Sequence, residues 1–239
     1  MTEVLAHEVT GSGPARAAGW GPSLLLVHAG IADRRMWDDQ VGPFAEAGWT
    51  VIRPDLPGFG ETPPPGRPVA LWAALRDLLD HLGVEQAAVV GASLGGRAAV
   101  DLALAVPERV RALVLVGSGL AGHPFQEPAP FELWDRSEGA IERGDHLEAA
   151  WVELDTGVVG MDRGPSAVTP EIRCRVEAML LAAYAHGEAD LEEPHPAAAG
   201  IPRAERVVLG GTAHLPNMER PEEFNRVVLE FLAKVGPAP

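Results

Sequence analysis

The stretch Gly91-Ala-Ser-Leu-Gly95 follows the apolar run Ala87–Val90 and precedes a helix-like sequence. A serine on a sharp strand-to-helix turn needs a glycine two positions before it and another two positions after it, because the backbone segments approach closely there. Such a turn lifts the hydroxyl clear of the sheet edge, so the pattern predicts that Ser93 is a nucleophile. A dinucleotide-binding loop is the competing interpretation. It is disfavoured because the Gly-x-Gly-x-x-Gly spacing is missing and Gly117-Ser118 stands where an acidic residue would end the next strand.

The length and composition predict a single globular domain. The chain has 239 residues, of which 46% are hydrophobic and 22% are charged, so it can bury a full core.

Its formal charge of -15 disfavours nucleic acid and anionic membrane surfaces as partners. Cys174 is the single cysteine, which excludes an intramolecular disulfide, and no stretch has the length of a membrane span. We therefore expect a cytoplasmic protein.

The order of apolar and amphipathic stretches predicts an α/β fold, with a mostly parallel sheet flanked by helices. Short apolar runs are typical of buried strands, and the stretches between them carry apolar residues at helical spacing. The predicted strands are Ser23–His28, Thr50–Arg53, Ala87–Val90, Ala112–Val116 and, late in the chain, Arg206–Leu209. The predicted helices are Arg35–Ala47, Ala70–Leu82, Leu94–Ala105 and Pro221–Val235.

The alternation of strands and helices stops between about residues 120 and 199. This region contains helix-like pieces and no strand-like run. We interpret residues 120–199 as a helical cap inserted into a core formed by residues 1–119 and 200–239. A continuation of the main helical layer is the alternative.

Histidine is the side chain whose pKa suits proton exchange with a serine hydroxyl near neutral pH. Of the eight histidines, His214 is the best candidate, because residues 210–217 form a loop between the last predicted strand and the last predicted helix. A loop at the carboxyl edge of the sheet can bring a base to Ser93. His28 ends a buried strand, and we expect it to bond to the backbone instead.

A serine that attacks a carbonyl creates an oxyanion, which needs two backbone N–H donors. Leu94 follows the nucleophile at the start of a helix, and its N–H is predicted to be one donor. The second donor is assigned to Gly30, in the turn after His28, because that strand end is expected to lie beside the serine turn.

Four separated motifs occur along the chain. They are Val27-His-Ala-Gly30 followed by Trp37, Asp55-Leu-Pro-Gly-Phe-Gly-Glu-Thr62, the serine turn, and Gly211-Thr-Ala-His-Leu-Pro216 running into Glu219-Arg-Pro-Glu-Glu-Phe224. With these motifs the chain resembles the α/β-hydrolases, in particular the capped group of esterases, enol-lactonases, carbon–carbon bond hydrolases and cofactor-free haloperoxidases. The resemblance implies a nucleophile elbow at Ser93. A serine at that position separates the chain from relatives that use aspartate to open epoxides or displace halide.

The resemblance also implies a catalytic acid, on the loop after a strand that precedes the histidine loop. A strand, a helix and two loops need about 25 residues, whereas residues 187–205 offer 19 and contain no apolar run. We therefore expect one strand, its acid loop and one helix to be missing. Asp190 is the candidate substitute acid, and a solvated charged loop is the simpler interpretation of its surroundings. A metal site is not expected, because His186, Asp190 and His195 have no recognised ligand spacing.

These observations predict a cofactor-independent serine hydrolase that cleaves a small carboxylic ester or lactone through an acyl-enzyme. The alternative is a catalytically impaired relative that acts as a small-molecule binding module or a strand-exchanged oligomer, since an unpaired strand edge favours exchange between subunits. Besides the small-molecule substrate, a second copy of the chain forming a homodimer is a candidate partner.

Overall fold

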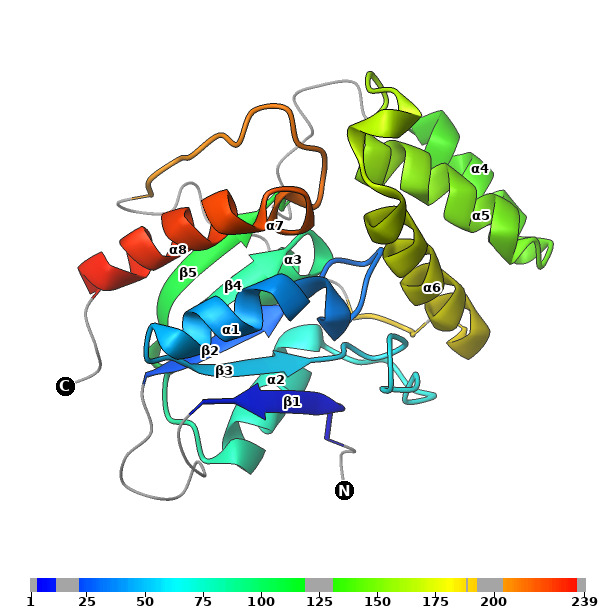
Figure 1. Ribbon diagram of the computed structural model, residues 1–239. Helices are drawn as coiled ribbons and strands as arrows, with labels where there is room; N and C mark the ends of the chain where they lie inside the picture. Colours follow the sequence, from blue (N-terminus) through cyan, green and yellow to red (C-terminus); the bar gives the residue numbers. More distant parts are fainter. Residues whose placement is uncertain (1–3, 12–21, 119–130, 188, 193–203, 236–239) are drawn as a thin grey trace.

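The computed structural model describes residues 4–11, 22–118, 131–187, 189–192 and 204–235. Within these ranges a sheet lies between two layers of helices, and a further group of helices stands beside it (Figure 1). The predicted α/β class with a mostly parallel sheet is confirmed.

The sheet of the described chain has five strands in the order β1-β3-β2-β4-β5. β1 runs antiparallel to β3, and the other neighbouring pairs are parallel. The central strands β2 and β4 are almost entirely apolar and buried, as expected for strands that are covered on both faces. The strands are β1 (His7–Thr10), β2 (Ser23–Val27), β3 (Thr50–Pro54), β4 (Ala87–Ala92) and β5 (Val110–Val116).

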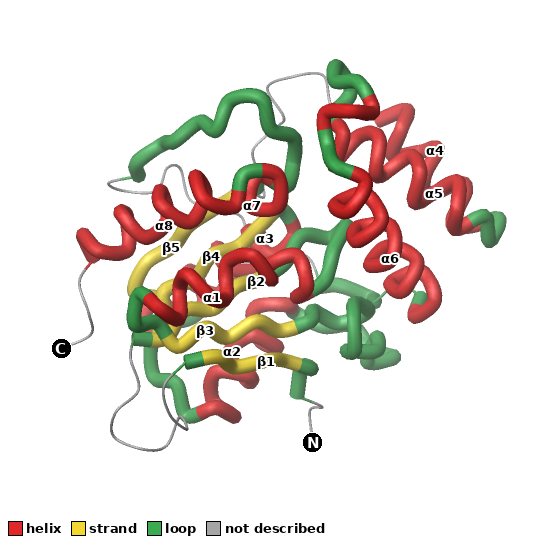
Figure 2. The backbone as a smooth tube through the Cα atoms, viewed as in Figure 1, coloured by secondary structure: helices red, strands yellow, loops and turns green. Residues whose placement is uncertain are grey.

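Two layers of helices cover the two faces of the sheet (Figure 2). The helices of the core are α1 (Asp38–Glu46), α2 (Leu71–Leu82), α3 (Leu94–Ala105), the short α7 (Pro216–Glu219) and α8 (Pro221–Val235). Successive side chains of a strand point to opposite faces. Leu24 and Leu26 therefore pack in the cluster that includes α1 and α8, while Leu25 and Val27 pack in the cluster that includes α2 and α3.

The strand register brings three chain segments together at the carboxyl edge of the sheet. Val27 of β2 pairs with Gly91 of β4, and Ala92 of β4 pairs with Val116 of β5. The turn after β2, the turn after β4 and the residues after β5 are consequently neighbours. This edge is where an open α/β sheet places its functional groups.

A helical segment, residues 131–186, connects the β5 side of the chain to the last part of the core. Its α6 is well specified locally, because the Thr169 side chain accepts a hydrogen bond from the Ile172 N–H and Pro170 occupies the first helical position. This segment lies within the predicted cap, and the predicted boundaries at 119–120 and 199–200 lie outside the described residues. Its elements are α4 (Phe131–Glu142), α5 (His146–Glu153), a π-helical turn (Leu154–Val159), a 3-10 turn (Pro165–Ala167) and α6 (Pro170–His186).

The predicted late strand Arg206–Leu209 is wrong. Residues 204–209 form no regular element, and the side chains of Val207 and Val208 are 59% and 71% exposed. A strand is stabilised by pairing with a neighbour and by burying one face, and this short run does neither. The expected loss of an acid-bearing unit falls mainly on residues 188 and 193–203, which lie outside the described residues.

β1 is a strand that the sequence pattern does not predict. This four-residue strand is mostly exposed and mostly polar, so it has no apolar run to mark it. It forms because its backbone pairs with β3, from His7 opposite Pro54 to Thr10 opposite Val51. The other predicted strands and helices are present with small shifts of their ends; the first helix begins with a 3-10 turn at Arg34–Trp37.

Candidate active site

Ser93 lies between the end of β4 and the start of α3, on the predicted turn. Its φ is +48° and its ψ is -111°, and it is the only non-glycine residue with positive φ in the described chain. A Cβ on Gly91 would lie 2.5 Å from the Gly95 carbonyl oxygen. A Cβ on Gly95 would collide with the carbonyl oxygens of Val27 and His28. The two glycines therefore have the steric role that the sequence predicted.

Gly30 and Leu94, the predicted oxyanion donors, lie side by side. A Cβ built on Gly30 would be 3.5 Å from the Leu94 Cδ2 atom. The Leu94 N–H has no intrahelical acceptor because Leu94 is the first residue of α3. Among the described residues no acceptor is found for the Gly30 N–H, which sits in a turn closed by the bond from Ala32 N–H to the Ala29 carbonyl. The arrangement leaves two backbone donors beside Ser93.

His28 is buried and has a structural environment, as expected. Its Nδ1–H donates to the Ala29 carbonyl at 2.8 Å, and its Nε2 accepts from the Leu56 N–H at 2.8 Å. These two bonds fix the neutral tautomer, and burial lowers the pKa of His28 below its usual value. His28 thus ties the end of β2 to the loop after β3 and has no nitrogen left to serve Ser93.

His214 lies against the end of β5, on the same corner of the sheet as Ser93. The Ser93 N–H donates to the Val116 carbonyl at 2.9 Å. A Cβ on the next residue, Gly117, would be only 3.1 Å from the His214 Nδ1 atom, and Gly117 has a φ of +54°. Among the hydrogen bonds of the described residues, none joins the Ser93 hydroxyl to the His214 ring.

Burial sets the protonation state of His214. It lowers the pKa of the imidazole below the usual value, because the charged form loses hydration. No carboxylate of the described residues counteracts this effect. His214 is therefore neutral at pH 7 and able to accept a proton, but within the described chain an imidazolium there has no acidic partner.

Asp190 is not brought to His214. Its carbonyl accepts a hydrogen bond from the Val69 N–H at 2.9 Å, and the Glu192 N–H donates to the Val69 carbonyl at 3.0 Å. This pairing holds Asp190 just before α2, with its side chain exposed. Nearby, the His186 Nε2–H donates to the Gly60 carbonyl at 2.8 Å. Within the described residues no group of three or more His, Cys, Asp or Glu side chains could hold a metal ion.

The contacts that hold the His214 loop carry no signal in the sequence. The Glu219 carboxylate accepts the Ala213 N–H at 2.6 Å and forms an ion pair with Arg163 at 2.6 Å. The His214 N–H donates to the Gly157 carbonyl at 3.0 Å. Glu219 was visible only as part of a motif, and nothing in the sequence marks Arg163 or Gly157, because their partners are about 56 residues away in the chain.

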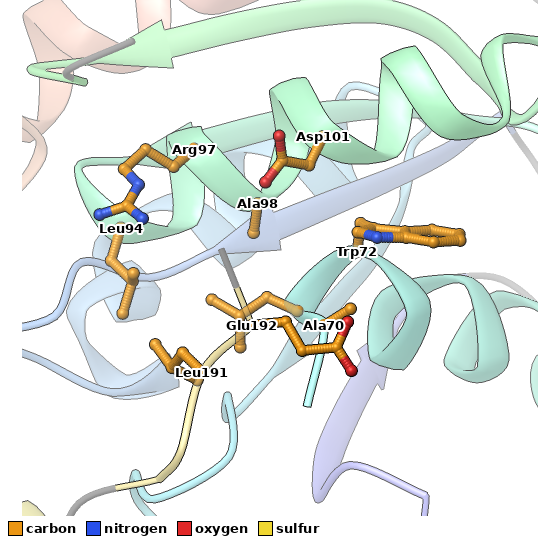
Figure 3. Close-up of a pocket in the computed structure, with 9 residues that line it drawn as sticks. Ala70, Trp72, Leu94, Arg97, Ala98, Asp101, Leu191 and Glu192 are labelled. Atoms are coloured by element: carbon orange, nitrogen blue, oxygen red, sulfur yellow. The ribbon is translucent and has the colours of Figure 1, made fainter. Parts of the chain in front are cut away.

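A small cavity that Leu94 helps to line lies apart from the lining expected of the candidate site. Its volume is about 20 Å³, and its lining comes from α2, α3 and the segment at 191–192 (Figure 3). Leu94 and Leu191 lie at one end, and Trp72 and Asp101 lie at the other. A cavity of this size holds about one water molecule, and neither Ser93 nor His214 lines it.

The described part of the chain contains no helix that is both long enough and apolar enough to cross a lipid bilayer.

Comparison with known proteins agrees with this geometry. The family model for the alpha/beta hydrolase fold matches residues 22–145, more than half of the chain. A 2-hydroxy-6-oxononadienedioate/2-hydroxy-6-oxononatrienedioate hydrolase from Paraburkholderia phymatum is 32% identical over 98% of this chain and 87% of its own length. A 2-hydroxy-6-oxo-6-phenylhexa-2,4-dienoate hydrolase from Burkholderia cepacia is 25% identical over 90% of this chain and 89% of its own.

A solved structure of similar fold is that of a thermophilic esterase from Thermogutta terrifontis. It is 25% identical, covers 97% of this chain and 93% of its own, and has a TM-score of 0.71. The matched relatives and the matched structure are hydrolases by name. The chain therefore belongs to the α/β-hydrolase family, and the comparisons support a hydrolase activity.

Proposed function

We propose that the protein is a cofactor-independent serine hydrolase of small carboxylic esters or lactones, with Ser93 as nucleophile and His214 as general base. The backbone of Ser93 carries the proposal. A non-glycine residue at φ +48° is strained by about 1–3 kcal/mol, and such strain persists mainly where a site requires it. The relationship to hydrolases and to an esterase of similar fold supports the same conclusion.

Acylation follows from the positions of these groups. Neutral His214 takes the proton of the Ser93 hydroxyl as the oxygen attacks the substrate carbonyl carbon. The negative charge moves to the carbonyl oxygen, where the N–H groups of Gly30 and Leu94 stabilise it. When the tetrahedral intermediate collapses, the bond to the alkoxide breaks, and the imidazolium returns its proton to the leaving oxygen.

Deacylation repeats these steps with water. His214 removes a proton from the water that attacks the acyl-enzyme, and the same two N–H groups stabilise the second oxyanion. The carboxylic acid then leaves as Ser93 regains its proton. A lactone follows the same course, except that the alkoxide stays attached to the acyl group. Each step uses only protein groups, water and substrate.

In this proposal Ser93 and His214 work as a dyad. Asp190 is held elsewhere, and the ring of His214 bonds to no carboxylate of the described residues. Replacing the acid of a serine–histidine–acid triad by an amide lowers kcat by about 10⁴-fold, mainly through the wrong tautomer. We therefore propose slow turnover, because no carboxylate of the described residues fixes the tautomer of the His214 ring.

The proposal is tested with a short-chain p-nitrophenyl ester. The wild-type protein is expected to hydrolyse the ester with saturation kinetics. The Ser93→Ala variant is expected to lose this activity while it keeps its fold by circular dichroism. Equal rates for the two folded proteins would refute Ser93 as nucleophile.

The second candidate function is a binding module or strand-exchanged oligomer without catalysis. Two observations favour it: the described residues give the His214 ring no acid, and β5 is the last strand of the sheet, with one edge not paired to a described strand. Light scattering and the ester assay separate the candidates. A monomer with Ser93-dependent turnover excludes the second, whereas an inactive dimer supports it.

A further inference from the structure

The loop that carries His214 is held from two sides. The Ala213 N–H donates to one oxygen of the Glu219 carboxylate at 2.6 Å, and the His214 N–H donates to the Gly157 carbonyl at 3.0 Å. Glu219 ends α7 in the core, whereas Gly157 belongs to the π-helical turn of the helical segment. Two consecutive amides of the loop are thus fixed by different parts of the molecule.

Arg163 belongs to the same helical segment as Gly157 and forms an ion pair with Glu219. Its Nη2 atom lies 2.6 Å from the second oxygen of the Glu219 carboxylate and donates to the Ala167 carbonyl at 3.1 Å. The side chains of Arg163 and Glu219 are 22% and 6% exposed, so water screens this ion pair little. Arg163 therefore holds the Glu219 carboxylate in place while that carboxylate binds the loop.

The helical segment also touches the loop directly. A Cβ on Gly160 would be 3.4 Å from the Ala213 Cβ, and within the segment the Gly160 carbonyl accepts the Arg163 N–H at 3.0 Å. On its other side the same π-helical turn meets the turn after β2, since a Cβ on Gly157 would be 2.9 Å from the Ile31 Cδ1 atom. The turn therefore bridges the two loops that border Ser93.

We propose that Arg163 is a positioning residue for His214, which acts through Glu219 and thereby makes the placement of the base depend on docking of the helical segment. The inference rests on the proposed role of His214. Its physical reason is that the His214 ring bonds to no carboxylate of the described residues, so the contacts of its backbone contribute to its orientation. A small displacement of a catalytic group lowers the rate strongly.

The first experiment compares Arg163→Ala with wild type in the ester assay. We expect kcat to fall about 10- to 100-fold, as for other groups that orient a catalytic residue, with little change in KM. Arg163→Lys keeps the charge and is expected to recover most of the lost kcat. The control is Arg173→Ala, which removes an arginine of the same segment that pairs with Asp155 at 3.9 Å and does not touch the loop. Its kcat should stay near that of wild type.

Equal losses in Arg163→Ala and Arg173→Ala would overturn the proposal, because general loosening of the segment would then explain both. An unchanged kcat in folded Arg163→Ala would overturn it as well. If Arg163→Ala does not fold, Glu219→Gln takes its place, because the amide oxygen can still accept the Ala213 N–H while the ion pair is lost. A smaller fall in kcat is then expected for Glu219→Gln, and an unchanged kcat would contradict the proposal.

Hydrogen–deuterium exchange of the peptide that spans residues 209–217 tests the same clamp without catalysis. Faster exchange in Arg163→Ala than in Arg173→Ala is expected, and equal exchange would overturn the clamp. A wild-type protein without Ser93-dependent turnover would refute the proposed function instead. The two failures are therefore distinguishable.

Discussion

The two halves of the candidate site are held in different ways. Ser93, Gly30 and Leu94 are placed by the register of β2 and β4 and by glycines a few residues away in the chain. His214 is placed by contacts from a distant helical segment and from Glu219. The nucleophile side is therefore a property of the sheet, whereas the base side depends on how separate elements dock. Substitutions on the nucleophile side should therefore mainly lower stability, whereas substitutions on the base side should mainly lower kcat.

The largest effect is expected from Gly95→Ala, which breaks the nucleophile side. The new Cβ would meet two backbone carbonyls and lie 2.7 Å from the Val27 carbonyl carbon. Neither strand nor helix can give way easily, so we expect a loss of stability of about 3 kcal/mol and loss of ester hydrolysis.

Urea unfolding measures this loss, and Gly210→Ala is the matched control on the base side. A Cβ on Gly210 meets nothing within 4 Å, so its effect should stay within about 0.5 kcal/mol. Similar unfolding midpoints for the two variants would show that the turn is not enforced by close backbone approach.

Gly117→Ala tests the base side directly and should have an intermediate effect. Its Cβ would approach the His214 Nδ1 atom at 3.1 Å, and the φ of +54° is unfavourable for alanine by about 1–2 kcal/mol. The imidazole must shift, so we expect kcat to fall by about tenfold.

The readout that separates a shifted base from a weakened fold is the rate per folded molecule, measured at a temperature far below unfolding. A variant that loses stability and keeps the wild-type kcat would mean that His214 does not act beside Gly117.

The smallest effect concerns the pH dependence. His214 acts in its neutral form, which predominates above its pKa. Because burial lowers this pKa, the acid limb of kcat/KM should have its midpoint below about 6.5, the ordinary histidine value. Activity therefore persists to lower pH than with an ordinary histidine. A midpoint above that value would indicate a carboxylate near the ring.

The sequence could predict the nucleophile side because the signals there are local. Gly91 and Gly95 mark a turn in which any larger residue would clash with the backbone, and apolar runs identify β2 and β4. The strand prediction for Arg206–Leu209 is wrong for the opposite reason. A short apolar run becomes a strand only when a neighbouring strand pairs with it, and the run itself does not show whether such a neighbour exists.

The base side could be predicted only in part. The place of His214 between the last predicted core elements makes it a candidate base, but Arg163 and Gly157 contact the loop through tertiary packing that no sequence spacing reveals. Asp190 illustrates the same limit. Its charge and position in the chain made it a candidate, yet backbone pairing with Val69 directs its segment elsewhere.

The central claim is that His214 activates Ser93, and the most direct measurement is the rate at which a fluorophosphonate probe labels the protein. Peptide mapping of the wild-type adduct should place the phosphonyl group on Ser93, and labelling of His214→Ala should be at least about 100-fold slower. An adduct on another residue, or equal labelling rates for the two proteins, would contradict the account.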